Sequence, residues 1–312
     1  MEHIFSINNL WHEHDYDKLI QLGYLHFRIN GIRVTSEACD VMKSVRNHYT
    51  GTNLYFDLPG NKCRIWTADK KRIEMKQNES ILVRKLDDGK SLYVTGKTFW
   101  DNIKVGDVLR TRRIGKRSME FKVENIEDNF LRGTVTKTGD VGFGYHIFNP
   151  YNYWLNAYIT DDDLAQFEKV KYLNPEIIAV SFADSPELIY EYKKIFSNKQ
   201  VFAKVESPAA VNNIEQIVYA ADGIIIGRDD LSAFYTMEQI REITMKILHL
   251  GKACDKKIIG ASNYFNDLYH YGVMSHMEIS DYQVLLENGA YGIYINETNN
   301  DADWKKYLMV FR

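Results

Sequence analysis

The sequence predicts an α/β protein: a (β/α)8 TIM-type barrel with a small all-β lid domain inserted into it. Short apolar strands alternate with amphipathic helices in the first and last parts of the chain, which is typical of such barrels. Between these parts, short runs with a two-residue period replace the helical pattern. The alternative fold is an open doubly wound sheet, but no glycine-rich phosphate-binding fingerprint follows the first strand.

Residues 1–66 are expected to form the first part of the barrel. Leu25 to Asn30 is predicted to be a strand that ends in polar residues. Ser36 to His48 has apolar residues at helical spacing, which predicts a helix. Asn53 to Asp57 is predicted to be a second strand, because it ends in an acid just before the turn signal Pro59-Gly60.

Residues 67–150 are expected to form the inserted lid domain. Glycine, aspartate and asparagine separate short alternating runs there, a pattern that indicates strands joined by turns. The runs are Ile81–Arg84, Ser91–Val94, Asp107–Arg110, Phe121–Val123 and Leu131–Val135.

Residues 151–312 return to α/β alternation and are expected to complete the barrel. Helices are predicted at Asp161 to Val170, with Thr160 as the N-cap, and at Pro186 to Phe196. Further strands are predicted at residues 177–182, 200–205, 223–226, 257–260 and 292–295.

The bulk composition excludes several classes of protein. The chain has 312 residues, of which 45% are hydrophobic, so it can bury a sizeable core. The net charge of −3 gives no support for a nucleic-acid or membrane partner. Cys39, Cys63 and Cys254 lack metal-type spacing and indicate a reducing compartment. Neither a signal peptide nor an apolar run long enough to span a bilayer is visible, so we expect a cytoplasmic protein.

Charged residues gather at the carboxyl ends of two predicted strands. Lys204 and Glu206 are two residues apart and therefore project from the same face of their strand. Three isoleucines end in Gly227-Arg228-Asp229-Asp230. The two interpretations are a binding site at the barrel mouth and an ion-pair network that caps the barrel. Buried charge is costly unless it is paired or bound to something, which favours the binding site.

Six segments, taken in order, resemble motifs of pyruvate kinase, and the β insertion falls where that family inserts its lid. Each is similar to one family motif, and together they cover nearly the whole chain. The segments are Phe27–Asn30, Asp57–Arg64, Lys204–Glu206, Asp222–Leu231, Lys257–Asn263 and Ile295–Thr298.

The resemblance implies a site for phosphoryl transfer, which needs positioned cations and a metal rather than covalent help from the protein. Glu206 and Asp230 would hold Mg²⁺ or Mn²⁺, since hard cations prefer carboxylate oxygens. Lys204 would lie against the transferred phosphoryl group and steady the enolate oxygen. Arg28 would contact the same phosphate.

The resemblance also implies positions for the rest of the substrates. The backbone N–H groups from Gly227 through Arg228 to Asp229 would receive the substrate carboxylate, with the Ser262 hydroxyl beside them. A second set would lie toward the nucleotide phosphates: Asn30, Asp57 and Arg64. Lys62 resembles the lysine that replaces the monovalent cation in the potassium-independent branch of the family.

Departures from the family motifs leave three functions open. Ile32-Arg33 stands where the family has Ser-His, and Ser262-Asn263 stands where it has Thr-Gln. The family's additional C-terminal domain is not expected after Arg312. The hypotheses are a phosphotransferase acting on phosphoenolpyruvate with ADP or ATP, an enzyme using the enolate of pyruvate or another 2-oxo acid in non-kinase chemistry, and a non-catalytic barrel that binds a metabolite. The oligomeric state stays open.

Overall fold

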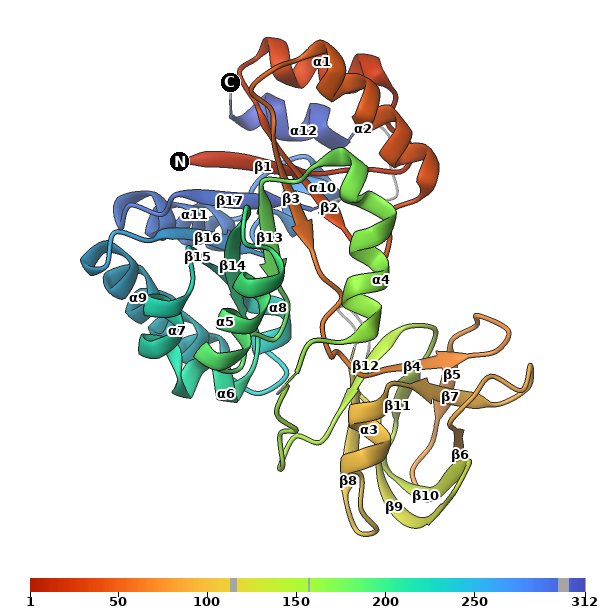
Figure 1. The fold of residues 1–312 in the computed structure, drawn as a ribbon. Coiled ribbons are helices and arrows are strands. Elements are labelled where there is room, and N and C mark those ends of the chain that lie inside the picture. The colour runs from red at the N-terminus through yellow and green to blue at the C-terminus, as the bar shows by residue number, and fades with distance from the viewer. Residues whose placement is uncertain (113–116, 157, 297–302, 312) are drawn as a thin grey trace. The chain divides into compact units, whose positions relative to one another are not determined.

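The computed structural model describes residues 1–112, 117–156, 158–296 and 303–311. The chain divides into two compact units, residues 1–60 with 157–312 and residues 61–156 (Figure 1). The expected bounds of the insertion, 67–150, were narrower. The difference arises because β4 (Arg64–Thr67) pairs with strands of the second unit, so the boundary comes directly after Gly60.

The first unit is a closed barrel of parallel strands whose order around the ring follows the chain. The last strand pairs with the first, which closes the ring and confirms the predicted barrel class. Its strands are β1 (Glu2–Ser6), β2 (His26–Asn30), β3 (Asn53–Asp57), β13 (Ile177–Val180), β14 (Gln200–Val205), β15 (Gly223–Gly227), β16 (Lys257–Ala261) and β17 (Gly292–Ile295). The sequence pattern indicated each of these strands except β1.

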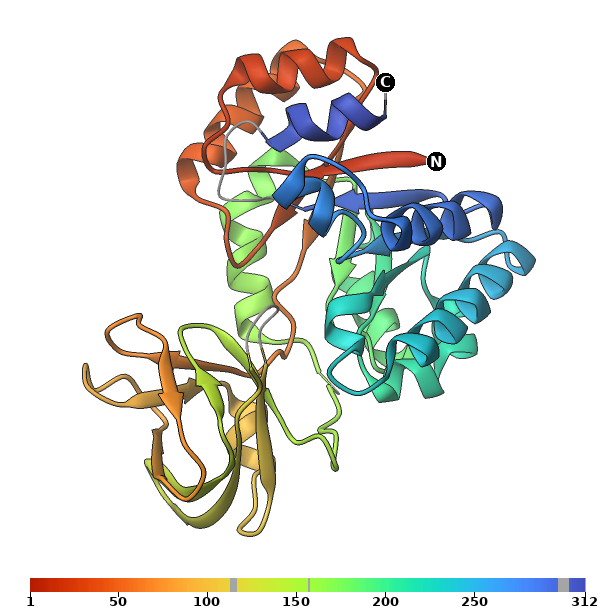
Figure 2. The same cartoon turned by 180° about the vertical axis from the view of Figure 1, so that it is seen from behind.

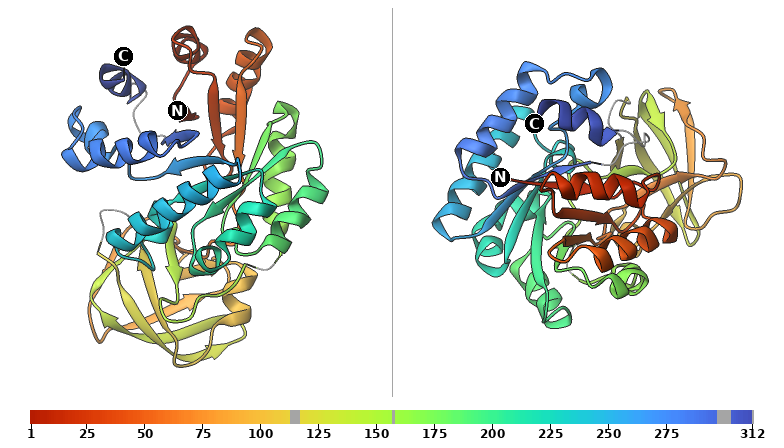
Figure 3. Two further views of the ribbon diagram at one scale, coloured as in Figure 1. Left: turned by 90° about the vertical axis from the view of Figure 1, so that its left-hand side faces the viewer. Right: turned by 90° about the horizontal axis from the view of Figure 1, so that it is seen from above.

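Helices lie outside this ring of strands (Figure 3). The bounds of α2 and α4 are as predicted, and Thr160 caps α4 by accepting a hydrogen bond from the backbone N–H of Asp163. Within the described ranges, no helix is both long and apolar enough to cross a membrane. The helices are α1 (Glu13–Gln21), α2 (Ser36–His48), α4 (Asp161–Val170), α5 (Pro186–Ile195), α6 (Pro208–Asn212), α7 (Ile214–Ala220), α8 (Arg228–Leu231), α9 (Met237–Ala253), α10 (Asn266–Tyr271), α11 (His276–Glu287) and α12 (Asp303–Val310), with a 3₁₀ turn at Lys171–Leu173.

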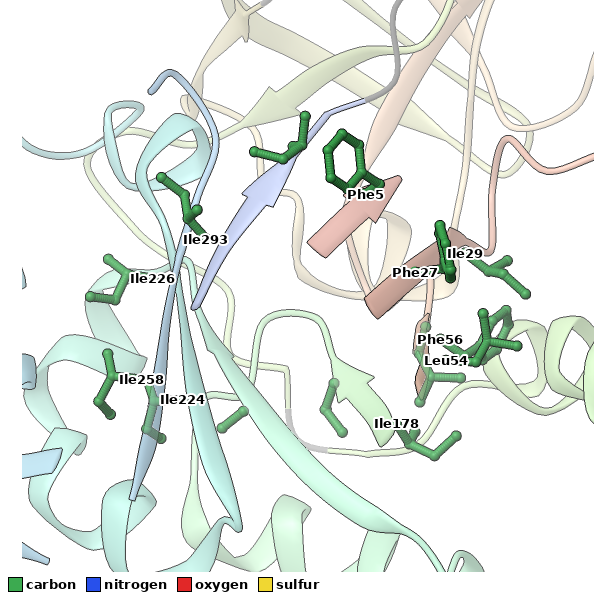
Figure 4. Close-up of a cluster of buried hydrophobic side chains, with 14 of the residues drawn as sticks. Phe5, Phe27, Ile29, Leu54, Phe56, Ile178, Ile224, Ile226, Ile258 and Ile293 are labelled. Carbon is green, nitrogen blue, oxygen red and sulfur yellow. The ribbon is translucent and has the colours of Figure 1, made fainter. Parts of the chain in front are cut away.

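The two-residue period of the strands sorts side chains into two apolar layers. One layer packs beneath the helices and includes Phe27, Phe56 and Ile224 (Figure 4). The other fills the barrel interior and includes Tyr55 and Phe202. Two residues further along the same strands, the inward positions are charged. The alternation that builds the core therefore also directs charge into the carboxyl end of the barrel.

The second unit is a smaller closed barrel, seen from behind in Figure 2, with its own apolar core. Its pairings are antiparallel except between β6 and β7. The ring consists of β10 (Phe130–Lys137), β6 (Ser80–Arg84), β7 (Leu92–Thr95), β4, β12 (Tyr145–Phe148), β8 (Val108–Arg112) and β9 (Glu120–Glu127), accompanied by the two-stranded sheet of β5 (Ile73–Met75) and β11 (Gly139–Val141) and by α3 (Lys97–Asn102).

Candidate active site

Lys204 lies at the centre of a buried charged cluster at the carboxyl end of the eight-stranded barrel. Its Nζ is 3.2 Å from Asp57 Oδ2 and 3.0 Å from Glu206 Oε1, and it donates a hydrogen bond of 3.0 Å to Ser181 Oγ. Burial by itself lowers the pKa of Lys204, but the two carboxylates outweigh it and hold that pKa above its ordinary value. The ammonium group is therefore retained as a cation.

Arg28 contacts the same oxygen of Asp57 as Lys204 does. Its Nε and Nη2 lie 3.0 and 2.9 Å from Asp57 Oδ2, and its Nη1 donates a hydrogen bond of 2.8 Å to Ser6 Oγ. Tyr294 donates its hydroxyl to the other oxygen, Asp57 Oδ1, at 3.2 Å. Burial raises the pKa of Asp57, but Arg28 and Lys204 more than offset this and hold it below its ordinary value.

These four residues, Arg28, Asp57, Lys204 and Glu206, form what we call the carboxyl-end cluster. All four are less than a tenth exposed. Two cationic groups face two carboxyl groups, so each buried charge has an opposite charge beside it. Such balance is what makes burial of charge tolerable, because an unpaired ion pays the full cost of leaving water.

Glu206 is positioned by backbone as well as by Lys204. Its Oε2 accepts a hydrogen bond of 3.0 Å from the backbone N–H of Phe182, a buried residue that follows β13 with φ of 50°. A left-handed conformation is costly for a non-glycine residue and persists where the surroundings enforce it. At Gly227, a Cβ atom would lie 2.5 Å from Glu206 Cγ, so only glycine leaves room for this side chain.

The two carboxylates predicted to hold a divalent cation lie at the carboxyl ends of adjacent strands. Glu206 follows β14, and Asp230 follows Gly227 on the short helix α8, at the end of the adjacent strand β15. Within the described residues, no group of three or more His, Cys, Asp or Glu side chains is arranged to hold a metal ion. Mg²⁺ usually keeps several waters and takes only one or two protein carboxylates, with substrate oxygens as further ligands. The donor set therefore fits such an ion.

Comparison with known proteins identifies the family to which this barrel belongs. Residues 15–301 match the family model "Pyruvate kinase, barrel domain". The chain belongs to the pyruvate kinase family. It is 26% identical over 192 residues to the pyruvate kinase of Methylorubrum extorquens and 20% identical over 294 residues to that of Pyrobaculum aerophilum.

The chain spans only part of these relatives. The matched regions cover 57% and 92% of this chain but 40% and 62% of the two relatives' own length. The crystal structure of the Pyrobaculum aerophilum pyruvate kinase superimposes with a TM-score of 0.78 at 17% identity, covering 99% of this chain and 73% of that one. This likeness confirms the fold.

The side chain of Arg228, a predicted substrate-binding residue, is turned toward the helices. It is buried with its guanidinium 4.3 Å from the centre of the Tyr264 ring, and its Nη2 lies 2.5 Å from Asp281 Oδ2 on α11. We expected the backbone N–H groups at this position, rather than the side chain, to receive the substrate carboxylate, and that role stays a prediction. The side chain instead ties the start of α8 to α11.

Asp57 also differs from its expected surroundings. The sequence placed it toward the nucleotide phosphates, whereas both of its oxygens contact cluster residues or Tyr294. Asn30 ends β2, and its Oδ1 accepts a hydrogen bond of 3.2 Å from the backbone N–H of Ile32. Asp57 therefore belongs to the carboxyl-end cluster and Asn30 lies at the turn that follows β2, and the expected role of both toward the nucleotide phosphates stays a prediction.

The remaining predicted residues lie in three places. Ser262 and Asn263 directly follow β16 and are both left-handed, with φ of 68° and 58°. Lys62 and Arg64 belong to the second unit, where Arg64 Nη1 donates a hydrogen bond of 3.1 Å to the carbonyl of Gly144. The end of the last family-like segment, Glu297-Thr298, lies outside the described residues.

Sequence reasoning missed four residues that hold the cluster. Ser6 and Tyr294 occupy inward positions, two residues after Ile4 and Gly292. Extending the two-residue alternation along β1 and β17 would have found both. Ser181 directly follows β13, and extending the alternation along that strand would have found it too. The left-handed backbone of Phe182 has no sequence signal, because tertiary contacts enforce it.

Proposed function

We propose that this chain is a pyruvate-kinase-like phosphotransferase, which moves a phosphoryl group between phosphoenolpyruvate and a nucleoside diphosphate with the help of Mg²⁺ or Mn²⁺. The observation that carries the proposal is the buried Lys204 between Asp57 and Glu206, with Arg28 also paired with Asp57. Membership of the pyruvate kinase family supports it.

The residues of the cluster suit the charges that such a reaction develops. Lys204, retained as a cation, would stabilise negative charge on the enolate oxygen and on the phosphoryl group in transfer. Arg28 would bind the phosphate, as planar guanidinium groups suit phosphate oxygens. Glu206 and Asp230 would hold the divalent cation, which would neutralise charge on the substrate oxygens.

The substrate carboxylate would be received at the start of α8. We assign it to the backbone N–H groups of Gly227 to Asp229 and to the hydroxyl of Ser262, on the family resemblance.

The roles toward the second substrate and the monovalent cation rest on the family resemblance alone. We assign Asn30 and Arg64 to the nucleotide phosphates and Lys62 to the role of a built-in cation. Activity that is independent of K⁺ in the unchanged protein, and that becomes K⁺-dependent in Lys62→Gln, would support the last assignment. Equal K⁺ dependence of both proteins would refute it.

A coupled assay with phosphoenolpyruvate, a panel of nucleoside diphosphates, and Mg²⁺ or Mn²⁺ tests the proposal. We expect turnover that needs the divalent cation and that is lost in Glu206→Gln. Glu176→Gln is the matched control: Glu176 is also paired with a cationic side chain, that of Arg46 at 2.6 Å, but it precedes β13 at the amino end of the barrel. Folded protein that turns over no diphosphate would refute the proposal.

A second candidate keeps the enolate and changes the reaction. Ile32 stands where the family motif has a serine, and its apolar side chain is 43% exposed in the turn after β2. An enzyme that uses pyruvate or another 2-oxo acid as an enolate nucleophile needs Lys204 and the cation but no nucleotide. Metal-dependent exchange of the pyruvate methyl protons in D₂O, followed by NMR and without phosphoryl transfer, would favour this candidate.

Calorimetric titration with oxalate, which mimics the enolate, separates both enzymes from a non-catalytic barrel. Binding that requires Mg²⁺ and disappears in Glu206→Gln is expected for either enzyme. Protein that binds neither the cation nor oxalate would leave a metabolite-binding role as the remaining hypothesis.

A further inference from the structure

Tyr294 crosses the interior of the eight-stranded barrel to reach the carboxyl-end cluster. It lies on β17, while its hydroxyl contacts Asp57 on β3, with β1 and β2 between these strands in the ring. The side chain is 2% exposed, and none of the family-like segments includes it. A buried tyrosine hydroxyl normally needs a partner, and this one has a charged partner in the proposed active site.

Tyr294 contacts two members of the cluster through different parts of its side chain. The hydroxyl donates to Asp57 Oδ1 at 3.2 Å, and the face of the ring lies 4.9 Å from the guanidinium carbon of Arg28. The first contact fixes the rotation of the carboxylate. The second limits movement of the guanidinium, whose Nη1 also donates a hydrogen bond to the Ser6 hydroxyl.

The two oxygens of the Asp57 carboxylate have different partners. Oδ2 receives Arg28 at 2.9 and 3.0 Å and Lys204 at 3.2 Å, while Oδ1 receives Tyr294. Burial, together with the charge of Asp57, holds the pKa of Tyr294 well above its ordinary value. The tyrosine therefore stays protonated and remains a hydrogen-bond donor.

We propose that Tyr294 is a positioning residue, which fixes Asp57 and through it sets the placement of Arg28 for a phosphorylated substrate. Arg28 is the cluster residue assigned to phosphate alone, so a loss of its placement should weaken binding of phosphoenolpyruvate. Enolate chemistry on unphosphorylated pyruvate depends on Lys204 and Glu206 and should be affected little.

Tyr294→Phe removes the hydroxyl and keeps the ring. Tyr55→Phe is the matched control, since Tyr55 is also buried inside the barrel, but its hydroxyl lies 3.2 Å from Nδ1 of His26 near the amino end. Tyr294→Leu removes both the hydroxyl and the ring over Arg28. The comparison therefore separates loss of any buried hydroxyl from loss of this one.

The kinetic prediction rests on the proposed function. In Tyr294→Phe we expect KM for phosphoenolpyruvate to rise about tenfold, the effect of losing one hydrogen bond to a charged group. We expect pyruvate proton exchange to change by less than about twofold. A general loss of folded protein would instead lower both reactions together. Tyr294→Leu should raise KM further, and Tyr55→Phe should leave it unchanged.

A second measurement does not depend on activity. In protein labelled with ¹⁵N-arginine, the Nε–H signal of Arg28, assigned by its loss in Arg28→Lys, should exchange with water faster in Tyr294→Phe than in the unchanged protein or Tyr55→Phe. Unchanged exchange in Tyr294→Phe would overturn the positioning role. If the unchanged protein shows neither turnover nor proton exchange, the proposed function fails, and the Arg28 signal still decides the role of Tyr294.

Discussion

The two closed barrels of this chain place charge in opposite ways. Inward positions of the eight-stranded barrel carry Arg28, Asp57 and Lys204 at the carboxyl ends of its strands. In the seven-stranded barrel the alternation on β9 puts Phe121 and Val123 inside and leaves Lys122 exposed.

The difference shows where burial of charge carries information about function. Along β9, charge at alternate positions solubilises the outer surface and costs nothing in desolvation. In the carboxyl-end cluster, charge has been taken out of water and balanced at distances of about 3 Å. Substitutions in the two barrels should therefore differ in their effects.

The same substitution in the two barrels should have very different consequences. Lys204→Met leaves Asp57 and Glu206 with Arg28 as the only cation of the cluster, so we expect a loss of about 3–5 kcal/mol in the free energy of unfolding. Turnover should fall by at least about 10²- to 10³-fold, the usual effect of removing one group that stabilises developing charge. Lys122→Met should change the free energy of unfolding by less than about 0.5 kcal/mol. Urea unfolding and the coupled assay measure both, and equal destabilisation by the two variants would contradict the contrast.

The apolar core of the seven-stranded barrel should be sensitive to volume rather than charge. Phe121 is fully buried, so Phe121→Ala should cost about 3–5 kcal/mol through lost burial and a residual cavity. Amide hydrogen exchange should speed up in β9 and β10. Amides of β14 and β15 that lost protection to the same extent would show that the two cores unfold as one.

The ion pair of Arg228 and Asp281 should have an intermediate effect, because it acts on the site through the start of α8. Arg228→Gln and Asp281→Asn should each lower kcat/KM by about tenfold, and a double-mutant cycle should show that the two effects are coupled. The exposed pair of Lys246 and Glu215 is the control, and Lys246→Gln should have no effect. Additive effects of the first two variants would refute the tie between α8 and α11.

His3 should give the smallest and most condition-dependent effect. Its ring on β1 packs against Tyr24, Tyr307 and Phe311, and burial lowers the pKa of His3 to about 4. Because the folded state disfavours the charged imidazole, the unfolded state binds more protons below its pKa of about 6.5. The free energy of unfolding should therefore be unaffected by His3 above that pH and should fall progressively as the pH is lowered toward 4. His3→Gln should flatten this dependence in thermal unfolding, whereas substitution of the exposed His249 should not.

The predicted elements show how much the local sequence pattern determines. The bounds of α2 and the N-cap of α4 follow from apolar spacing and from Thr160, both of which act over a few residues. β1 escaped detection because its five residues mix acid, histidine and apolar side chains. Its identity as a strand comes from pairing with β2 and β17, which no local pattern specifies.

The sequence predicted which charged residues belong to the candidate site better than it predicted which of them pair with one another. The two-residue period placed Lys204 and Glu206 on one face from the sequence alone. The pairing of Lys204 with Asp57 joins β14 to β3 across the intervening strand β13, and therefore depends on the order in which distant strands pair. The turn of Arg228 toward Asp281 depends in the same way on how α11 packs.

By itself, the sequence determined the class of fold and the strand ends at which charge would collect, because alternation and helical spacing are properties of neighbouring residues. Only the tertiary structure decided which charges neutralise one another, that Asp57 belongs with Lys204, and that Tyr294 reaches both Asp57 and Arg28. The physical reason is that the energy of a buried charge depends on distances of a few ångströms between residues far apart in the chain, and closure of the barrel sets those distances.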